Sequence, residues 1–119
     1  MIVVAWLLFA LGVTHLAFGV VRFRGPIAEA WAAGFVGQFA APEARRTAFW
    51  FLVVGPLLMA LGQIAVHAVR TGDRWPLGVI GGYLLATSVV GVAAFPKSPF
   101  WATLALAPLF VAGALGVVP

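Results

Sequence analysis

The sequence predicts an all-α integral membrane protein, a bundle of four transmembrane helices with one interfacial helix in the first loop. Its 119 residues are 64% hydrophobic and only 8% charged, whereas soluble domains carry about 25% charged residues. Between Arg45 and Arg70, roughly 23 residues without Asp, Glu, Lys or Arg would form a helix about 35 Å long, enough to cross a hydrocarbon core of about 30 Å. Three further apolar stretches flank this one and read as its packing partners.

Composition also narrows the chemistry. The absence of cysteine excludes disulfides, thiolate catalysis and thiolate metal sites. The net charge of +4 is better explained by arginines at membrane interfaces than by nucleic-acid binding, so the expected partner is the lipid bilayer and not nucleic acid. We expect no cofactor and no metal site, because His15 and His67 fall near opposite membrane faces and no intramembrane carboxylate completes a shell.

The first helix is predicted over 2–21 and is read as a retained helix, since it lacks the basic start of a signal peptide. Its polar side chains are Thr14 and His15. Gly12 and Gly19 are seven residues apart and share a face, which predicts close helix packing there.

The only long connection is loop 1, residues 22–46. Within it, Trp31, Phe35 and Phe39 recur at four-residue spacing and predict one apolar helical face. A helix over 28–41 is too short to span, so we expect it to lie in the membrane interface.

The remaining helices are predicted over 47–69, 77–95 and 100–118, joined by the short turns 70–76 and 96–99. Gly55 and Gly62 share a face of the 47–69 helix for close packing, and Pro56 predicts a kink. The 100–118 helix has almost no polar side chain, and we expect it to face lipid or a second copy of the chain. All four helices form a single domain over 1–119.

Loop charges predict the orientation. The side of the 22–46 and 96–99 loops carries five basic residues and the other side two, respectively Arg22, Arg24, Arg45, Arg46 and Lys97 against Arg70 and Arg74. Positive charge favours the cytoplasmic side. We therefore expect these two loops in the cytoplasm and both termini outside.

His15 is the leading candidate for a ligand site. It would lie about 9 Å inside the cytoplasmic edge, and a titratable group at that depth is by default a hypothesis for a functional site. With Arg22 and Trp50 at a similar level, and Glu29 and Gln38 in the loop above, it could bind a lipid headgroup or the polar end of an amphiphile. The catalytic residues, if any exist, are not identifiable from the sequence.

An alternative gives His15 a structural role, as a neutral side chain hydrogen-bonded to Thr87, Ser88 or a backbone carbonyl. At that depth the side chain of His15 must face either the helix bundle or water.

A second polar patch combines Gln63, His67 and Tyr83 near the outer surface. Because the loop between their helices is short, those helices must be antiparallel neighbours. A Gln63–Tyr83 hydrogen bond is the simplest interpretation of this patch.

The whole chain resembles a family of small four-helix bacterial membrane proteins catalogued as a domain of unknown function. The resemblance rests on three motifs: His15-x-x-Phe18-Gly19, Arg46-x-x-Phe49-Trp50-Phe51 with Gly55 and Gly62, and Pro96-x-Ser98-x-Phe100-Trp101. The family usually has glycine at the position of Pro99, so this turn is stiffer here. The resemblance implies four spans in the bacterial cytoplasmic membrane and no established activity.

The favoured function is a structural or partner-binding membrane subunit, as a homo-oligomer or with another membrane protein. The alternative is a binding or catalytic site for an apolar or lipid-like molecule around His15. An enzyme is not favoured, because no nucleophile with an oriented base is apparent. Transport is less favoured still, because Glu29, Glu43 and Asp73 all fall in loops rather than inside a span.

Overall fold

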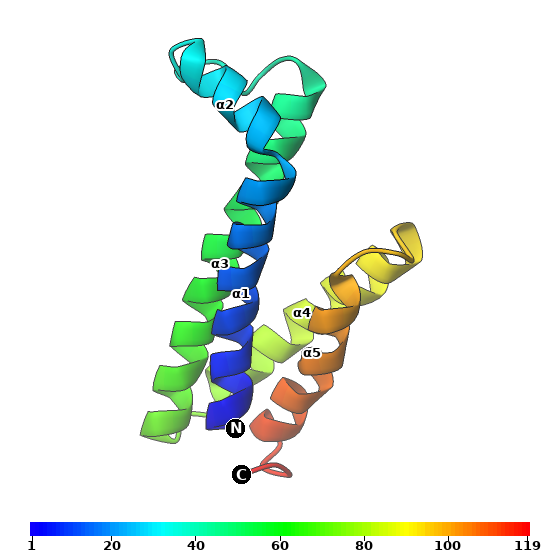
Figure 1. Cartoon of the computed structure of the whole chain (residues 1–119). Helices are drawn as coiled ribbons and strands as arrows, with labels where there is room; N and C mark the ends of the chain where they lie inside the picture. Colours follow the sequence, from blue (N-terminus) through cyan, green and yellow to red (C-terminus); the bar gives the residue numbers. More distant parts are fainter. The chain divides into compact units, whose positions relative to one another are not determined.

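The computed structural model describes residues 1–119 and confirms the predicted all-α class. It contains five helices and no strand (Figure 1): α1 (Ile2–Arg22), α2 (Arg24–Ala32), α3 (Glu43–Thr71), α4 (Trp75–Ala94) and α5 (Phe100–Ala114).

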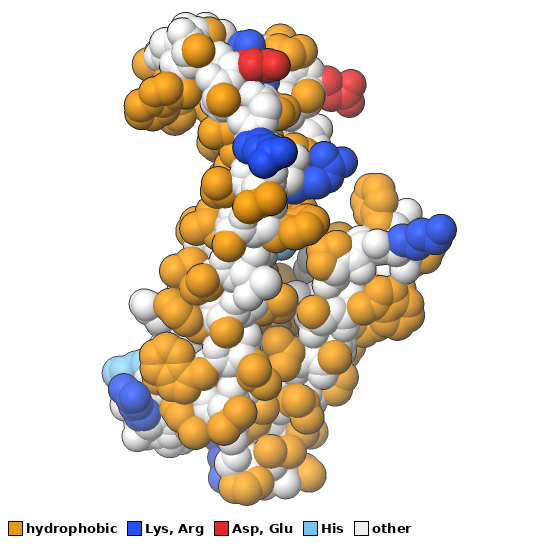
Figure 2. All heavy atoms as spheres, in the orientation of Figure 1, with side chains coloured by type: hydrophobic (Ala, Val, Ile, Leu, Met, Phe, Trp, Pro, Cys, Tyr) orange, Lys and Arg blue, Asp and Glu red, His pale blue; other side chains and the backbone are white.

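Three of these helices, α1, α3 and α4, are long and apolar enough to cross a membrane. The fourth predicted span is shorter: α5 has 15 residues, or about 22 Å against about 30 Å of hydrocarbon. Large apolar side chains cover the surface, as Figure 2 shows for one face. Leu57 is 59% exposed and Val90 68% exposed, as expected where the surroundings are apolar.

The chain divides into two compact units. The hairpin unit combines Met1–Ala10 with Ala60–Pro119, and the loop unit is Leu11–Met59. The hairpin unit therefore holds α4 and α5 with the start of α1 and the end of α3. The loop unit holds α2 with the rest of α1 and α3. In Figure 1, α2 turns away from the end of α1, and α4 and α5 form an antiparallel pair.

In the loop unit, α1 and α3 approach through glycines. A Cβ added to Gly12 would come within 2.6 Å of both the carbonyl oxygen of Gly55 and the backbone nitrogen of Met59. A Cβ on Gly19 would lie 2.8 Å from the ring of Phe51. Neither gap admits a side chain, so glycine sets the distance between the two helices.

The hairpin unit uses the same device. A Cβ on Gly62 of α3 would come within 2.5 Å of the backbone of Phe9 in α1. On α4, the Phe100 ring lies over Gly91, where an added Cβ would overlap it. Farther along, a Cβ added to Gly81 would lie 2.8 Å from the backbone nitrogen of Val111. The α4–α5 pair is therefore packed along its length.

One face of α5 is buried against α4 in this pair. Phe110 is fully buried, and the hydroxyl of Ser88 on α4 donates a hydrogen bond of 2.7 Å to that of Thr103 on α5. Gly91 and Gly81 make room for the aromatic side chains of α5, so an almost wholly apolar helix still has a specific partner.

Three helices end in the same way, at a glycine with positive φ. After α2, Gly34 has φ of 101°, and the amide of Phe35 bonds back to the carbonyl of Ala30 while that of Gly34 bonds to Trp31. This Schellman arrangement satisfies the last carbonyls of a helix. Gly72 after α3 and Gly116 after α5 have φ of 73° and 76° with equivalent backbone bonds.

These endings correct the predicted boundaries. The loop helix was expected over 28–41, but α2 covers 24–32, because Gly34 ends it and Pro26 is tolerated in its first turn. The last helix was expected over 100–118 and ends at Ala114, because Gly116 follows. At its start α3 is longer than the predicted 47–69, since a helix can continue beyond the apolar stretch that marks a span.

Replacing Gly12 with alanine should destabilise the protein, because the methyl group would overlap backbone atoms that cannot move aside. We expect a loss of about 1–3 kcal/mol in the free energy of unfolding, measured by circular dichroism in mild detergent. The matched control is Gly82→Ala on α4, where a Cβ meets nothing within 4 Å and a gain of about 0.5–1 kcal/mol is expected. Equal stability of the two variants would contradict the proposed packing role of Gly12.

Candidate functional site

His15 lies on α1, half-buried, and contacts α3 in two ways. Its ring stacks on that of Phe51, with centroids 4.0 Å apart and planes inclined by 16°. Its Nε2 is 2.8 Å from the backbone carbonyl oxygen of Phe51. Because a carbonyl oxygen only accepts, Nε2 must carry the proton and donate. His15 therefore holds α1 against α3 through a single residue of the partner helix.

The backbone that His15 reaches is next to an interruption in α3. Pro56 lies inside the helix and has no N–H for the carbonyl of Leu52, four residues earlier. Phe51 directly precedes Leu52. Around the Phe51 ring, Phe18 and Phe23 complete an aromatic cluster, with centroids at 6.0 and 5.3 Å.

The other residues named with His15 lie at the same end of the loop unit but make separate contacts. Arg22 is exposed and lies 5.4 Å from the Phe23 ring. Trp50 is 63% exposed, and Glu29 is exposed on α2. Gln38 accepts a hydrogen bond from an arginine of α3. No hydrogen bond, ion pair or ring contact joins His15 directly to any of these four residues.

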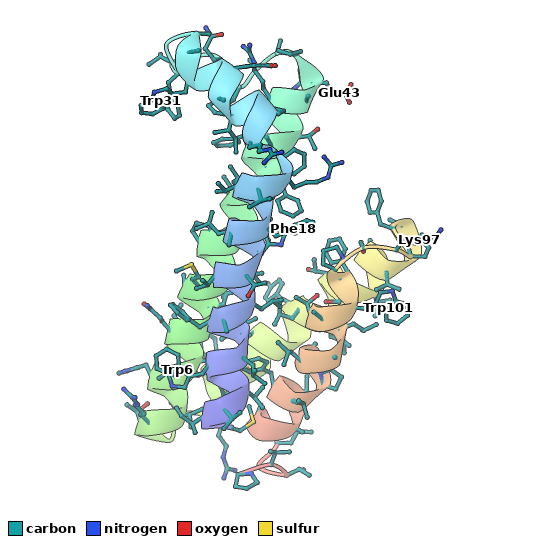
Figure 3. The ribbon with its side chains drawn as sticks, viewed as in Figure 1. Trp6, Phe18, Trp31, Glu43, Lys97 and Trp101 are labelled. Atoms are coloured by element: carbon teal, nitrogen blue, oxygen red, sulfur yellow. The ribbon has the colours of Figure 1, made fainter.

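A chain of aromatic rings connects α2 and its following turns to α3. Trp31 contacts Phe35, Phe35 contacts Phe39, Phe39 contacts Phe49 and Phe49 contacts Trp50, with centroid separations between 5.3 and 5.9 Å. The first three rings follow the four-residue spacing of the sequence, although only Trp31 is in a helix. Phe35 adopts a positive φ of 67°, which places its ring between the other two. Figure 3 shows Trp31 and Glu43 at this end and Phe18 farther along α1.

Two arginines of α3 hold the loop in place, a role that the sequence did not reveal. Nη1 of Arg45 donates to Oε1 of Gln38 at 3.1 Å. Nε and Nη2 of Arg46 both donate to the carbonyl oxygen of Ala40, at 3.2 and 2.7 Å. The signal available in the sequence was the arginine pair Arg45 and Arg46 directly after the loop.

An open groove of about 490 Å³ lies beside this arginine-held loop. Its walls are Phe39, Ala40, Phe49 and Trp50, and Arg46 lies at its polar edge. Of the candidate residues named from the sequence, the groove includes Trp50, and Gln38 is next to it in the chain. His15, Arg22 and Glu29 are not part of it.

The second predicted patch is divided by the structure. Gln63 and His67 line a smaller groove of about 250 Å³ with Trp6, Val66 and Arg70. Tyr83 is 75% exposed on α4 and shares no hydrogen bond with Gln63. The buried face of α4 follows a helical stripe through Leu77, Ile80, Gly81, Leu84, Ser88 and Gly91, and Tyr83 falls outside that stripe.

No three His, Asp or Glu side chains come together in a group that could hold a metal ion.

Fold and site together define a small all-helical protein with span-length apolar helices and an arginine- and aromatic-lined loop at one end. The chain belongs to a family of unknown function, DUF6463, whose model matches residues 1–115. The family-level resemblance predicted from the motifs is thereby confirmed. No curated protein and no solved structure matches the chain.

Replacing His15 tests its contact with Phe51. His15→Phe keeps the stacked ring and loses the hydrogen bond, so we expect a loss of about 1 kcal/mol in the free energy of unfolding. His15→Ala also loses the ring contact and should cost a further amount of about 0.5–1.5 kcal/mol. Both are measured by denaturant titration in mild detergent. If both variants were as stable as the original protein, His15 would have no structural role.

Proposed function

We propose that the protein is a small multi-pass membrane subunit that acts by packing against other membrane proteins, including copies of itself. The observation that carries this proposal is the distribution of polar and apolar groups. His15 and Ser88 are engaged inside the chain by Phe51 and Thr103, whereas large apolar side chains on α1, α3 and α4 face outward. Such a surface is suited to lipid and to other helices rather than to water.

The proposal includes four membrane crossings, with α5 as the fourth. Two contacts support this: Phe100 lies over Gly91 near one end of α4, and Ala114 lies 3.3 Å from a Cβ placed on Gly78 near the other end. A helix that runs back along most of a spanning helix returns to the side from which that helix started. With four crossings, the residues after α5 lie on the same side as the 72–74 turn, and the distribution of basic residues supports an outside location for that side.

Single cysteines test this topology cleanly, because the chain has none of its own. We expect cysteines at Thr71 and Val117 to react with a membrane-impermeant maleimide from one side of the membrane, and a cysteine at Lys97 from the other. All three positions are exposed or close to exposed. If the cysteines at Val117 and Lys97 were labelled from the same side of the membrane, α5 would not cross it.

Photo-crosslinking in the native membrane tests the packing function. Benzoylphenylalanine at Leu57 or Val90, both largely exposed, should give a discrete protein adduct of fixed mass. The matched control is the same group at Phe110, which is fully buried and should give only products within the chain. Native mass spectrometry in mild detergent then reports the subunit count. A monomer without any stoichiometric protein adduct at the exposed positions would refute the packing function.

The alternative function, a site for an apolar or lipid-like molecule around His15, stays a prediction. The same mass spectrum distinguishes this alternative from the packing function. A small molecule bound at His15 would be lost in His15→Ala and retained in Gly82→Ala. An adduct that persists in both variants is bound elsewhere.

A further inference from the structure

The groove beside the 33–42 loop has two chemically different parts. Its walls are the rings of Phe39, Phe49 and Trp50, and Trp50 is largely exposed. Arg46 is the charged residue among those that line it. An open, largely apolar groove with one cationic side chain matches a ligand with a hydrocarbon part and an anionic head.

The guanidinium of Arg46 uses some of its N–H donors within the chain and keeps others for a further acceptor. Two of its five N–H groups reach the carbonyl oxygen of Ala40, which fixes the direction of the planar head. The side chain is exposed and forms no ion pair with a carboxylate. Its charge is therefore not neutralised within the chain, while its position is held.

The helix that carries Arg46 is longer than a membrane is thick. α3 has 29 residues, about 43 Å against about 30 Å of hydrocarbon. Its charged side chains lie only near its ends, Glu43, Arg45 and Arg46 at the start and Arg70 at the finish. In a membrane the first turns of α3 emerge among the headgroups, where lipid phosphates lie and where tryptophan is favoured.

The charge of the surroundings selects among lipids. The loop unit contains four arginines and two glutamates, and it has no lysine. A headgroup with its own ammonium gains less here than one with an uncompensated phosphate, since the excess charge of the unit is positive.

We propose that this groove binds one anionic phospholipid, with its phosphate on Arg46 and an acyl chain along Phe49 and Trp50. The proposal goes beyond packing between proteins and does not depend on it. The held guanidinium forms charge-assisted hydrogen bonds to the phosphate, and the aromatic wall contacts the first methylenes of the chain.

The test titrates the full-length protein in mild detergent with dioleoyl-phosphatidylglycerol or dioleoyl-phosphatidylcholine, which share their acyl chains. Native mass spectrometry counts bound lipids. We expect one phosphatidylglycerol to bind about tenfold more tightly than phosphatidylcholine. In Arg46→Gln this preference should disappear, because loss of hydrogen bonds to a charged group is worth about one order of magnitude. Glutamine can still donate to the carbonyl of Ala40, so the loop keeps a partner.

Two further variants distinguish specific binding in the groove from non-specific attraction to positive charge and from the effects of misfolding. Arg24→Gln removes the same charge from the loop unit at an exposed position outside the groove, and should leave the preference intact. Trp50→Ala leaves every arginine in place. It should weaken the binding of both lipids and keep the ratio of their affinities unchanged.

Equal loss of preference in Arg24→Gln and Arg46→Gln would overturn the proposal, since it would show only diffuse attraction. Unchanged affinities in Trp50→Ala would overturn it as well, even if Arg46→Gln failed to fold. Lipid adducts and subunit number are read from different mass differences, so failure of the lipid site is distinguishable from failure of the packing function.

Discussion

The close approach of helix backbones at glycine is the constraint on which the rest of the structure depends. Lipid tails are as apolar as the side chains, so the hydrophobic effect does not drive helices together in a membrane. Their association depends on close van der Waals packing. In the loop unit, Gly12 and Gly55 bring α1 and α3 close enough for His15 to reach the backbone of Phe51. A wider spacing would remove that hydrogen bond and the ring stack together.

Much of this arrangement could be predicted, because apolar length and glycine spacing are properties of one segment at a time. The starts and lengths of α1 and α4 follow closely from their apolar stretches. The roles of individual glycines were harder to assign. Gly12 and Gly34 look alike in a sequence, but one accommodates a neighbouring backbone and the other ends a helix with positive φ. Only the surrounding hydrogen bonds separate the two roles.

The candidate site was only partly accessible to sequence reasoning. The polarity of His15 favoured a position facing the bundle or water, and a backbone carbonyl was among its expected partners; in the structure its Nε2 contacts the carbonyl of Phe51. Its placement with Trp50 and Gln38 in one ligand site stays a prediction, because the position of Gln38 depends on the path of the 33–42 loop. That path is set by two guanidinium groups and a positive φ at Phe35, which no periodic pattern records.

The early end of α5 has a consequence for the bilayer itself. In the topology that we propose, α5 is a crossing helix of 15 residues, about 8 Å shorter than an average hydrocarbon core. Hydrophobic mismatch of this kind is relieved by local thinning of the bilayer, at a cost that rises with each ångström. With that topology, the α5 side of the protein would gather short-chain lipids and would favour thin regions of a membrane over thick ones. A glycine at position 116, by ending one helix early, would influence where in a membrane the protein resides.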